Sequence, residues 1–136
     1  KLTGYAVGIL PKLRIHGESV MEELRLKAKH PEYITEILKE ERNSIWVGKV
    51  KELDLGEFTA NIFPKLRLHE ENVMEKLRLS VYTPECIAEI LKAKDKSIWI
   101  GKIRKISLEG YTKEIENKLD FTLIAPDCQE ENEDAA

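Results

Sequence analysis

Two histidine–glutamate pairs recur in this sequence of 136 residues. Glu18 follows His16 by two positions, and Glu71 follows His69 in the same way. Imidazole nitrogens and carboxylate oxygens are good ligands for a divalent metal, so the pairs could form one site if the fold joined them. Polar residues of these kinds are also common in turns, and nothing in the spacing requires the pairs to meet. We therefore predict polar turns, with no metal and no cofactor.

Nucleophilic and acid–base chemistry have weak support. The two cysteines, Cys86 and Cys128, are far apart and form no CxxC motif, which favours free thiols over a disulfide or a zinc site. Carboxylates are abundant, and none is isolated in the apolar surroundings that would tune a general acid or base. The sequence predicts no catalytic residue and a protein that is not an enzyme.

Trp46 and Trp99 are each followed by one apolar residue and then Gly-Lys. Large aromatic side chains usually fill a core, and that is the prediction here; the alternative is that they stack on a base or line a ligand pocket. Gly48 and Gly101 lie inside predicted strands, which indicates a bulge or a close backbone approach. Neither glycine belongs to a phosphate-binding loop, because no GxxxxGK[ST] motif is present.

The two tryptophans belong to an internal repeat. Residues 11–26 read PKLRIHGESVMEELRL and residues 64–79 read PKLRLHEENVMEKLRL. A shift of 53 residues aligns 9–53 with 62–106 without a gap, and about half of the positions are identical. Such a match indicates duplication of one unit, which predicts two pseudo-symmetric halves that share a core.

The hydrophobic periods predict strand, strand, helix, strand in each copy. Alternation predicts strands at 12–16 and 65–69, and favours a strand over a helix for 21–30 and 74–83. Apolar stripes and prolines at the first helical position predict helices at 30–42 and 83–96. Further strands are expected at 44–55, 97–108 and 121–126. The last of these reads FTLIAP and resembles GYAVGILP (4–11) and EFTANIFP (57–64), which are also expected to begin strands. Residues 109–119 fit either a hairpin arm or a short helix.

The predicted fold class is α+β: an antiparallel sheet built from the tandem repeat (strand-strand-helix-strand twice plus a closing strand), with the helices on one side. Residues 1–126 are predicted to form a single domain, with repeats at about 5–56 and 58–108 and a closing strand at 119–126. Residues 127–136 form an acidic tail. The connection at 53–58 is too short and too apolar for a flexible linker, so we predict that neither half folds alone.

Parity along the predicted strands sorts the side chains onto two faces. Six apolar residues of the first copy should face the helices: Leu13, Ile15, Leu24, Leu26, Trp46 and Val50. The opposite face is basic, and its cations are the predicted nucleic-acid-binding residues: Lys12, Arg14, Arg25, Lys49, Lys51, Lys65, Arg67, Arg78, Lys102 and Arg104.

Charge is distributed unevenly. The formal net charge is −3, but five acids fall in the last ten residues without a lysine or arginine among them. Such a tail is either solvated or competes with nucleic acid for the basic surface. The abundance of charged residues, at 35%, and the single glutamine are typical of hyperthermophile proteins, so we expect a thermophilic archaeon or bacterium as the source.

These observations favour a cytoplasmic, non-enzymatic accessory protein that binds DNA or RNA through its basic sheet face, since lysine and arginine release phosphate counterions. No apolar run is long enough to cross a membrane, so no membrane partner is expected. Two alternatives stay open: a protein–protein adaptor or oligomer-forming subunit of a larger complex, and a small-ligand domain that uses a cleft between the repeats.

Overall fold

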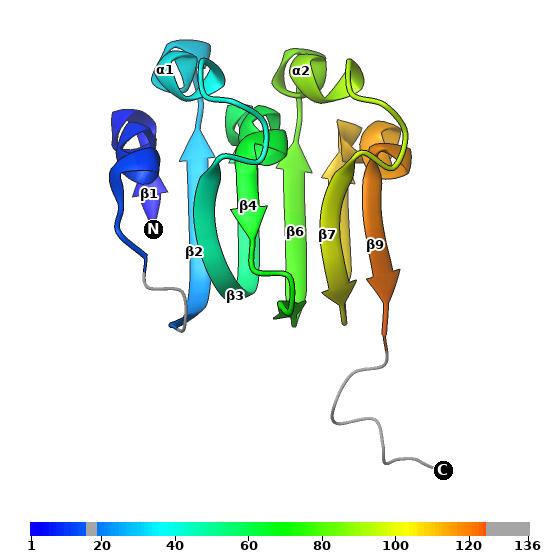
Figure 1. Cartoon of the computed structure of the whole chain (residues 1–136). Coiled ribbons are helices and arrows are strands. Elements are labelled where there is room, and N and C mark those ends of the chain that lie inside the picture. Colours follow the sequence, from blue (N-terminus) through cyan, green and yellow to red (C-terminus); the bar gives the residue numbers. More distant parts are fainter. Residues whose placement is uncertain (16–18, 125–136) are drawn as a thin grey trace.

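A computed structural model describes residues 1–15 and 19–124 (Figure 1). The chain winds back and forth between two layers of strands, and every strand pair is parallel. The rear layer contains β1 (Leu2–Thr3), β2 (Val20–Ala28), the second part of β3 (Ile45–Glu57), β6 (Lys76–Val81) and β8 (Ile106–Gly110). The front layer contains the first part of β3, β4 (Leu66–Leu68), β5 (Val73–Met74), β7 (Ile98–Ile103) and β9 (Leu119–Leu123).

Short helical segments connect the two layers at one end of the strands (Figure 1). Most of them are 3₁₀ turns, and each comes after a rear-layer strand, either at once or after two intervening residues. In chain order they are η1 (Gly4–Lys12), η2 (Pro31–Tyr33) with α1 (Thr35–Leu38), η3 (Phe58–Lys65), η4 (Pro84–Ile87) with α2 (Ala88–Leu91), and η5 (Tyr111–Lys118). At the opposite end the chain returns to the rear layer, in one case by the curvature of β3 itself.

The core lies between the two layers and under the helical turns. Alternate residues of the rear strands point inward, such as Leu24 and Leu26 of β2 and Leu77 and Leu79 of β6, and all four are almost fully buried. The front strands and helical turns complete one continuous apolar cluster. Burial of each leucine or isoleucine side chain stabilises the fold by about 1.5–3 kcal/mol, so this cluster supplies the main driving force for folding.

The predicted antiparallel sheet of two pseudo-symmetric halves is wrong. β2 pairs with β3, β3 with β6, and β6 with β8, and all three ladders are parallel. Parallel neighbours need a crossover, and here the crossover runs up one layer, over a helical turn and down the other layer. The helices therefore cap one end of a two-layer structure and do not cover a sheet face.

Individual elements also differ from the predictions. The segments GYAVGILP and EFTANIFP form the 3₁₀ turns η1 and η3 instead of strands. In η3, the Thr59 hydroxyl donates to the carbonyl oxygens of Leu26 and Gly56, which ties this turn to the ends of β2 and β3. The predicted long helices shorten to a 3₁₀ turn and one α-helical turn each, beginning at Pro31 and Pro84.

Other predictions are confirmed. β2 is a strand and not the rival helix. Residues 111–118 of the ambiguous segment form the short helical alternative, η5. Leu24, Leu26 and Val50 are buried as expected, whereas Leu13 is exposed and Ile15 is half-buried. None of the helices in residues 1–15 and 19–124 is long and apolar enough to span a membrane.

Candidate functional site

The two tryptophans lie at the surface, so the prediction that they fill the core is wrong. Trp99 is 45% exposed and Trp46 is half-buried. The cause is the glycine two positions after each tryptophan. Gly48 and Gly101 adopt φ of +70° and +90°, and the pairing register shifts at both places, as the predicted bulges require.

Each bulge inserts one residue and reverses the inside–outside alternation of its strand. Val50 therefore points inward although it shares parity with Trp46, which points outward. The glycine also makes room for the indole, because a Cβ on Gly101 would lie only 3.0 Å from Cζ2 of Trp99. Sequence parity alone placed both tryptophans on the wrong face.

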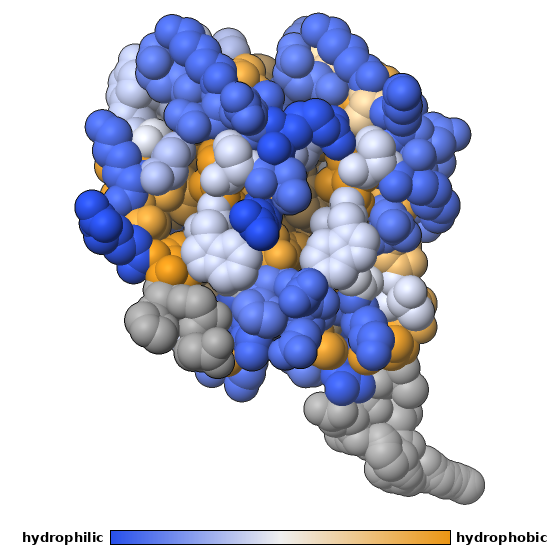
Figure 2. Space-filling model, in the orientation of Figure 1, coloured by the Kyte–Doolittle hydropathy of each residue, from blue (hydrophilic) through white to orange (hydrophobic). Residues whose placement is uncertain are grey.

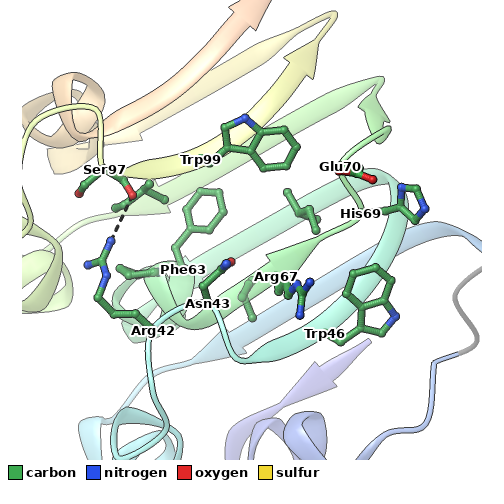
Figure 3. A pocket seen from close by; sticks show the side chains of 13 residues that line it. Arg42, Asn43, Trp46, Phe63, Arg67, His69, Glu70, Ser97 and Trp99 are labelled. Carbon is green, nitrogen blue, oxygen red and sulfur yellow. Dashed lines mark hydrogen bonds between the residues drawn. The ribbon is translucent and has the colours of Figure 1, made fainter.

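A hollow of about 550 Å³ lies between the two tryptophans on the front layer (Figure 3). We call it the tryptophan hollow and define it by the following lining residues: Arg42, Asn43, Trp46, Phe63, Pro64, Leu66, Arg67, Leu68, His69, Glu70, Ser97, Ile98 and Trp99. Four of these are buried apolar residues, namely Phe63, Leu66, Leu68 and Ile98, and they form its floor. Figure 2 shows this face, with hydrophobic atoms deep in a hollow that hydrophilic residues surround.

The hollow occupies a gap in the strand pairing of the front layer. β4 pairs with β3 on one side, and β7 pairs with β5 and β9, but no ladder joins β4 to β7 in the described residues. A long-range hydrogen bond bridges the gap near the helical end, where Nη2 of Arg42 donates to the carbonyl oxygen of Ser97 at 3.1 Å. The opening is therefore a consequence of the sheet topology.

Two guanidinium groups belong to the tryptophan hollow. The Arg67 guanidinium carbon lies 5.6 Å from the centroid of the Trp46 ring, within cation–π range, and His69 approaches the same ring at 5.9 Å between centroids. Neither Arg67 nor Arg42 forms an ion pair with a carboxylate in the described part of the chain. Both guanidinium groups retain donors that a ligand could use.

The arginines of the rear layer are in a different situation. Arg25 lies 2.7 Å from Glu23 and 3.8 Å from Asp54, and Arg78 lies 3.7 Å from the same Asp54 carboxylate. Arg78 also makes a bidentate contact with Glu109, at 3.0 and 3.2 Å. The result is a row of alternating charges across the outer face of the rear layer.

This row shifts the pKa values of its members. The hydrogen bonds from Arg78 and from the Tyr82 hydroxyl stabilise the carboxylate and lower the pKa of Glu109 below its usual range. The same bonds raise the pKa of Arg78 and that of Tyr82, because each is the protonated partner of an anion. The predicted basic face is thus largely neutralised at its centre.

The remaining predicted cations are scattered. Lys51 pairs with Glu22 at 3.3 Å, and Arg104 pairs with Glu75 at 3.2 Å. Lys12 and Arg14 are exposed at and just after the end of η1. Arg14 is close to the Trp46 end of the front layer, because a Cβ on Gly48 would lie only 3.4 Å from the side chain of the next residue, Ile15. The other three lie on β3, at the end of η3 and on β7: Lys49, Lys65 and Lys102. The structure therefore does not gather the ten residues on one face.

The candidate metal residues do not form a site in the described residues. His16 and Glu18 lie outside them. Nδ1 of His69 accepts a hydrogen bond from the backbone N–H of Glu71, which is a turn contact of the predicted kind. Within residues 1–15 and 19–124, no three His, Cys, Asp or Glu side chains are placed to hold a metal ion.

Cys86 is buried in the core next to the Thr83 hydroxyl, 3.2 Å away. Burial raises the pKa of its thiol, which disfavours the reactive thiolate. This environment gives no support to a nucleophilic role. Cys128 lies outside the described residues.

Comparisons of the chain with models of protein families, with curated proteins and with solved structures find no match.

Proposed function

We propose that this chain is a non-catalytic nucleic-acid-binding protein and that the tryptophan hollow is its contact surface. The observation that carries the proposal is the combination of two surface indoles, exposed Trp99 and half-buried Trp46, with two arginines that lack carboxylate partners in the described residues. Proteins that bind nucleic acid with little sequence preference combine aromatic stacking surfaces with cations that track the phosphates. The sequence predicted a contact through cations alone and assigned both tryptophans to the core, whereas this proposal combines the cations with the indoles.

The rear layer is a poorer contact surface. To contact phosphates, Arg25 and Arg78 would have to give up bonds to Glu23, Asp54 and Glu109. These carboxylates would also repel the phosphates at short range. The proposal therefore assigns binding to the front layer and a structural role to the rear charge row.

The test is a titration of a fluorescently labelled oligonucleotide of mixed sequence with the full chain, followed by anisotropy at several salt concentrations. Arg67→Ala and Arg25→Ala form a matched pair, because each removes one exposed arginine from a different layer. We expect Arg67→Ala to weaken binding several-fold and to flatten the log–log salt slope by about one unit, as one lost phosphate contact requires. Arg25→Ala should change neither quantity by much.

Equal effects of the two variants would remove the assignment to the front layer. Absence of any salt-sensitive binding by the parent protein would refute the proposal and favour the protein–protein adaptor.

A small-ligand domain is the second candidate, because the hollow is concave and has an apolar floor. A mononucleotide or other small aromatic anion would then bind as tightly as an oligonucleotide. Competition by mononucleotides in the same anisotropy assay separates the two functions.

A further inference from the structure

Building on the proposed function, we infer that the hollow selects single-stranded over duplex nucleic acid, by holding one unpaired base between Trp46 and Trp99. The two indoles come from β3 and β7, on opposite sides of the gap in the front layer (Figure 3). Between them lies a concave space with an apolar floor, whereas a flat basic surface would suit an intact duplex.

The shape of the hollow decides what can enter it. Its volume of about 550 Å³ is sufficient for a base and part of its sugar, and is typical of sites for ligands of that size. A base inside a duplex is stacked on both faces and paired at its edge, so it would have to leave the helix at a cost of a few kcal/mol. A base in a single strand enters without that cost, and the indoles offer it aromatic faces.

The charges fit a strand that passes over the opening. Arg67 lies beside the Trp46 ring, and Arg42 lies at the end of the hollow nearer Ser97 (Figure 3). Cations at these two places can contact the phosphates on either side of an inserted base. Among the described residues that line the hollow, Glu70 alone carries a carboxylate, and it lies beside His69, away from Arg42.

A second, independent observation concerns Ser97. This residue lines the hollow, and its hydroxyl oxygen is buried without a hydrogen-bond partner in the described residues. Buried polar atoms are normally paired, so an unpaired one in a pocket wall marks a group that awaits a partner.

A neighbouring hollow gives the strand a continuation. It has a volume of about 420 Å³, and Trp99 belongs to its wall as well as to that of the first hollow. Lys102 and Thr122 also line it, together with the carboxylates of Glu70 and Glu71. Because Glu70 and Glu71 would repel phosphates, we expect the phosphates to pass on the side of Trp99 that faces Arg42 and Arg67. Only the next base should then contact this second hollow.

The experiment compares three unlabelled competitors of equal length against a labelled single strand: an ordinary single strand, the blunt duplex of the same sequence, and a strand of abasic units. Intrinsic fluorescence is a direct second readout, since Trp46 and Trp99 are the only tryptophans in the chain. We expect the single strand to compete at least about tenfold better than the duplex. It should also quench the emission, whereas the abasic strand should compete weakly and quench little.

Two variants locate the base. Trp99→Ala should weaken single-strand binding at least about fivefold, as loss of one stacking partner predicts, and should reduce the preference over the duplex. Tyr111→Ala is the control, because it also removes an exposed aromatic residue, from η5 outside the hollow. Ser97→Ala should leave thermal stability unchanged and weaken binding by a smaller factor.

The outcomes separate the two proposals. If the duplex binds as tightly as the single strand, or if Trp99→Ala binds normally, the inference about the unpaired base is wrong while the proposed function stands. If neither form of nucleic acid binds, the proposed function itself fails. Circular dichroism of Trp99→Ala checks that weaker binding does not result from unfolding.

Discussion

Glu57 occupies a backbone conformation that suits glycine, so its side chain should strain the backbone. Replacing Glu57 with glycine tests this directly. Its φ is +58° and its ψ is −131°. The residues 53 positions before and after it are Gly4 and Gly110, whose φ angles are +62° and +70°. Gly110 also matches it in ψ, at −133°. A side chain in this region is strained, because its Cβ crowds the neighbouring backbone.

The expected gain follows from two opposing effects. Relief of this kind of strain is worth about 1–3 kcal/mol. A new glycine costs about 0.5–1 kcal/mol, because it gives the unfolded chain more freedom. The Glu57 carboxylate forms no ion pair in the described residues, so little is lost with the side chain. Glu57→Gly should therefore raise the free energy of unfolding by up to about 2.5 kcal/mol, and Tm by roughly 3–5 °C for each kcal/mol.

The assay is urea and thermal denaturation followed by circular dichroism. Glu57→Ala is the matched control, since it removes the carboxylate but keeps the Cβ that causes the strain, and it should give no gain. Gly110→Ala is the reverse change and should destabilise the protein strongly, because its Cβ would collide with the carbonyl oxygen of Val81. If Glu57→Gly were no more stable than Glu57→Ala, the backbone argument would be refuted.

Three further predictions use other parts of the structure. Gly101→Ala should lower stability by about 1–3 kcal/mol and shift the tryptophan emission, because its φ is +90° and its Cβ would displace the Trp99 ring. The ionised Glu109 side chain should contribute its full stabilisation above the ordinary glutamate pKa, about 4.3, and this contribution should be lost as the pH falls through the lower pKa of Glu109 in the folded protein. In Glu109→Gln, this part of the pH dependence of stability should vanish. Deleting 127–136 should raise nucleic-acid affinity most at low salt, because five acids are removed; unchanged affinity would mean that the tail does not compete for the binding surface.

Local structure was predictable where one physical signal dominated. Alternation in 21–30 favoured a strand over the rival helix, and the structure has a strand at Val20–Ala28; Pro31 and Pro84 marked helix starts correctly. EFTANIFP misled because it is apolar and β-favouring, while its actual structure depends on long-range bonds such as that from Thr59 to Leu26. Parallel pairing could not be derived, because strand direction depends on where the chain crosses between layers, and two clear strands do not reveal that.

The candidate site shows the same limit. The cations and the tryptophans were visible in the sequence, and the glycines were recognised as probable bulges. The step that was missed is that a bulge after Trp46 and Trp99 reverses parity, which moves both indoles from the core to the surface. The acid partners of Arg25 and Arg78 come from other strands, so only the three-dimensional register distinguishes a neutralised arginine from an available one.

The parallel stacking has a mechanical consequence. β1 lies at one edge of the rear layer, and β8 lies at the other, close in sequence to β9. A force that pulls the two ends of the described chain apart acts along the direction of the hydrogen bonds between strands. The hydrogen bonds between two strands then break one after another, and not all at once as they would under shear. We expect the outermost strands to peel away at low force, one after another, while the strands between them remain paired.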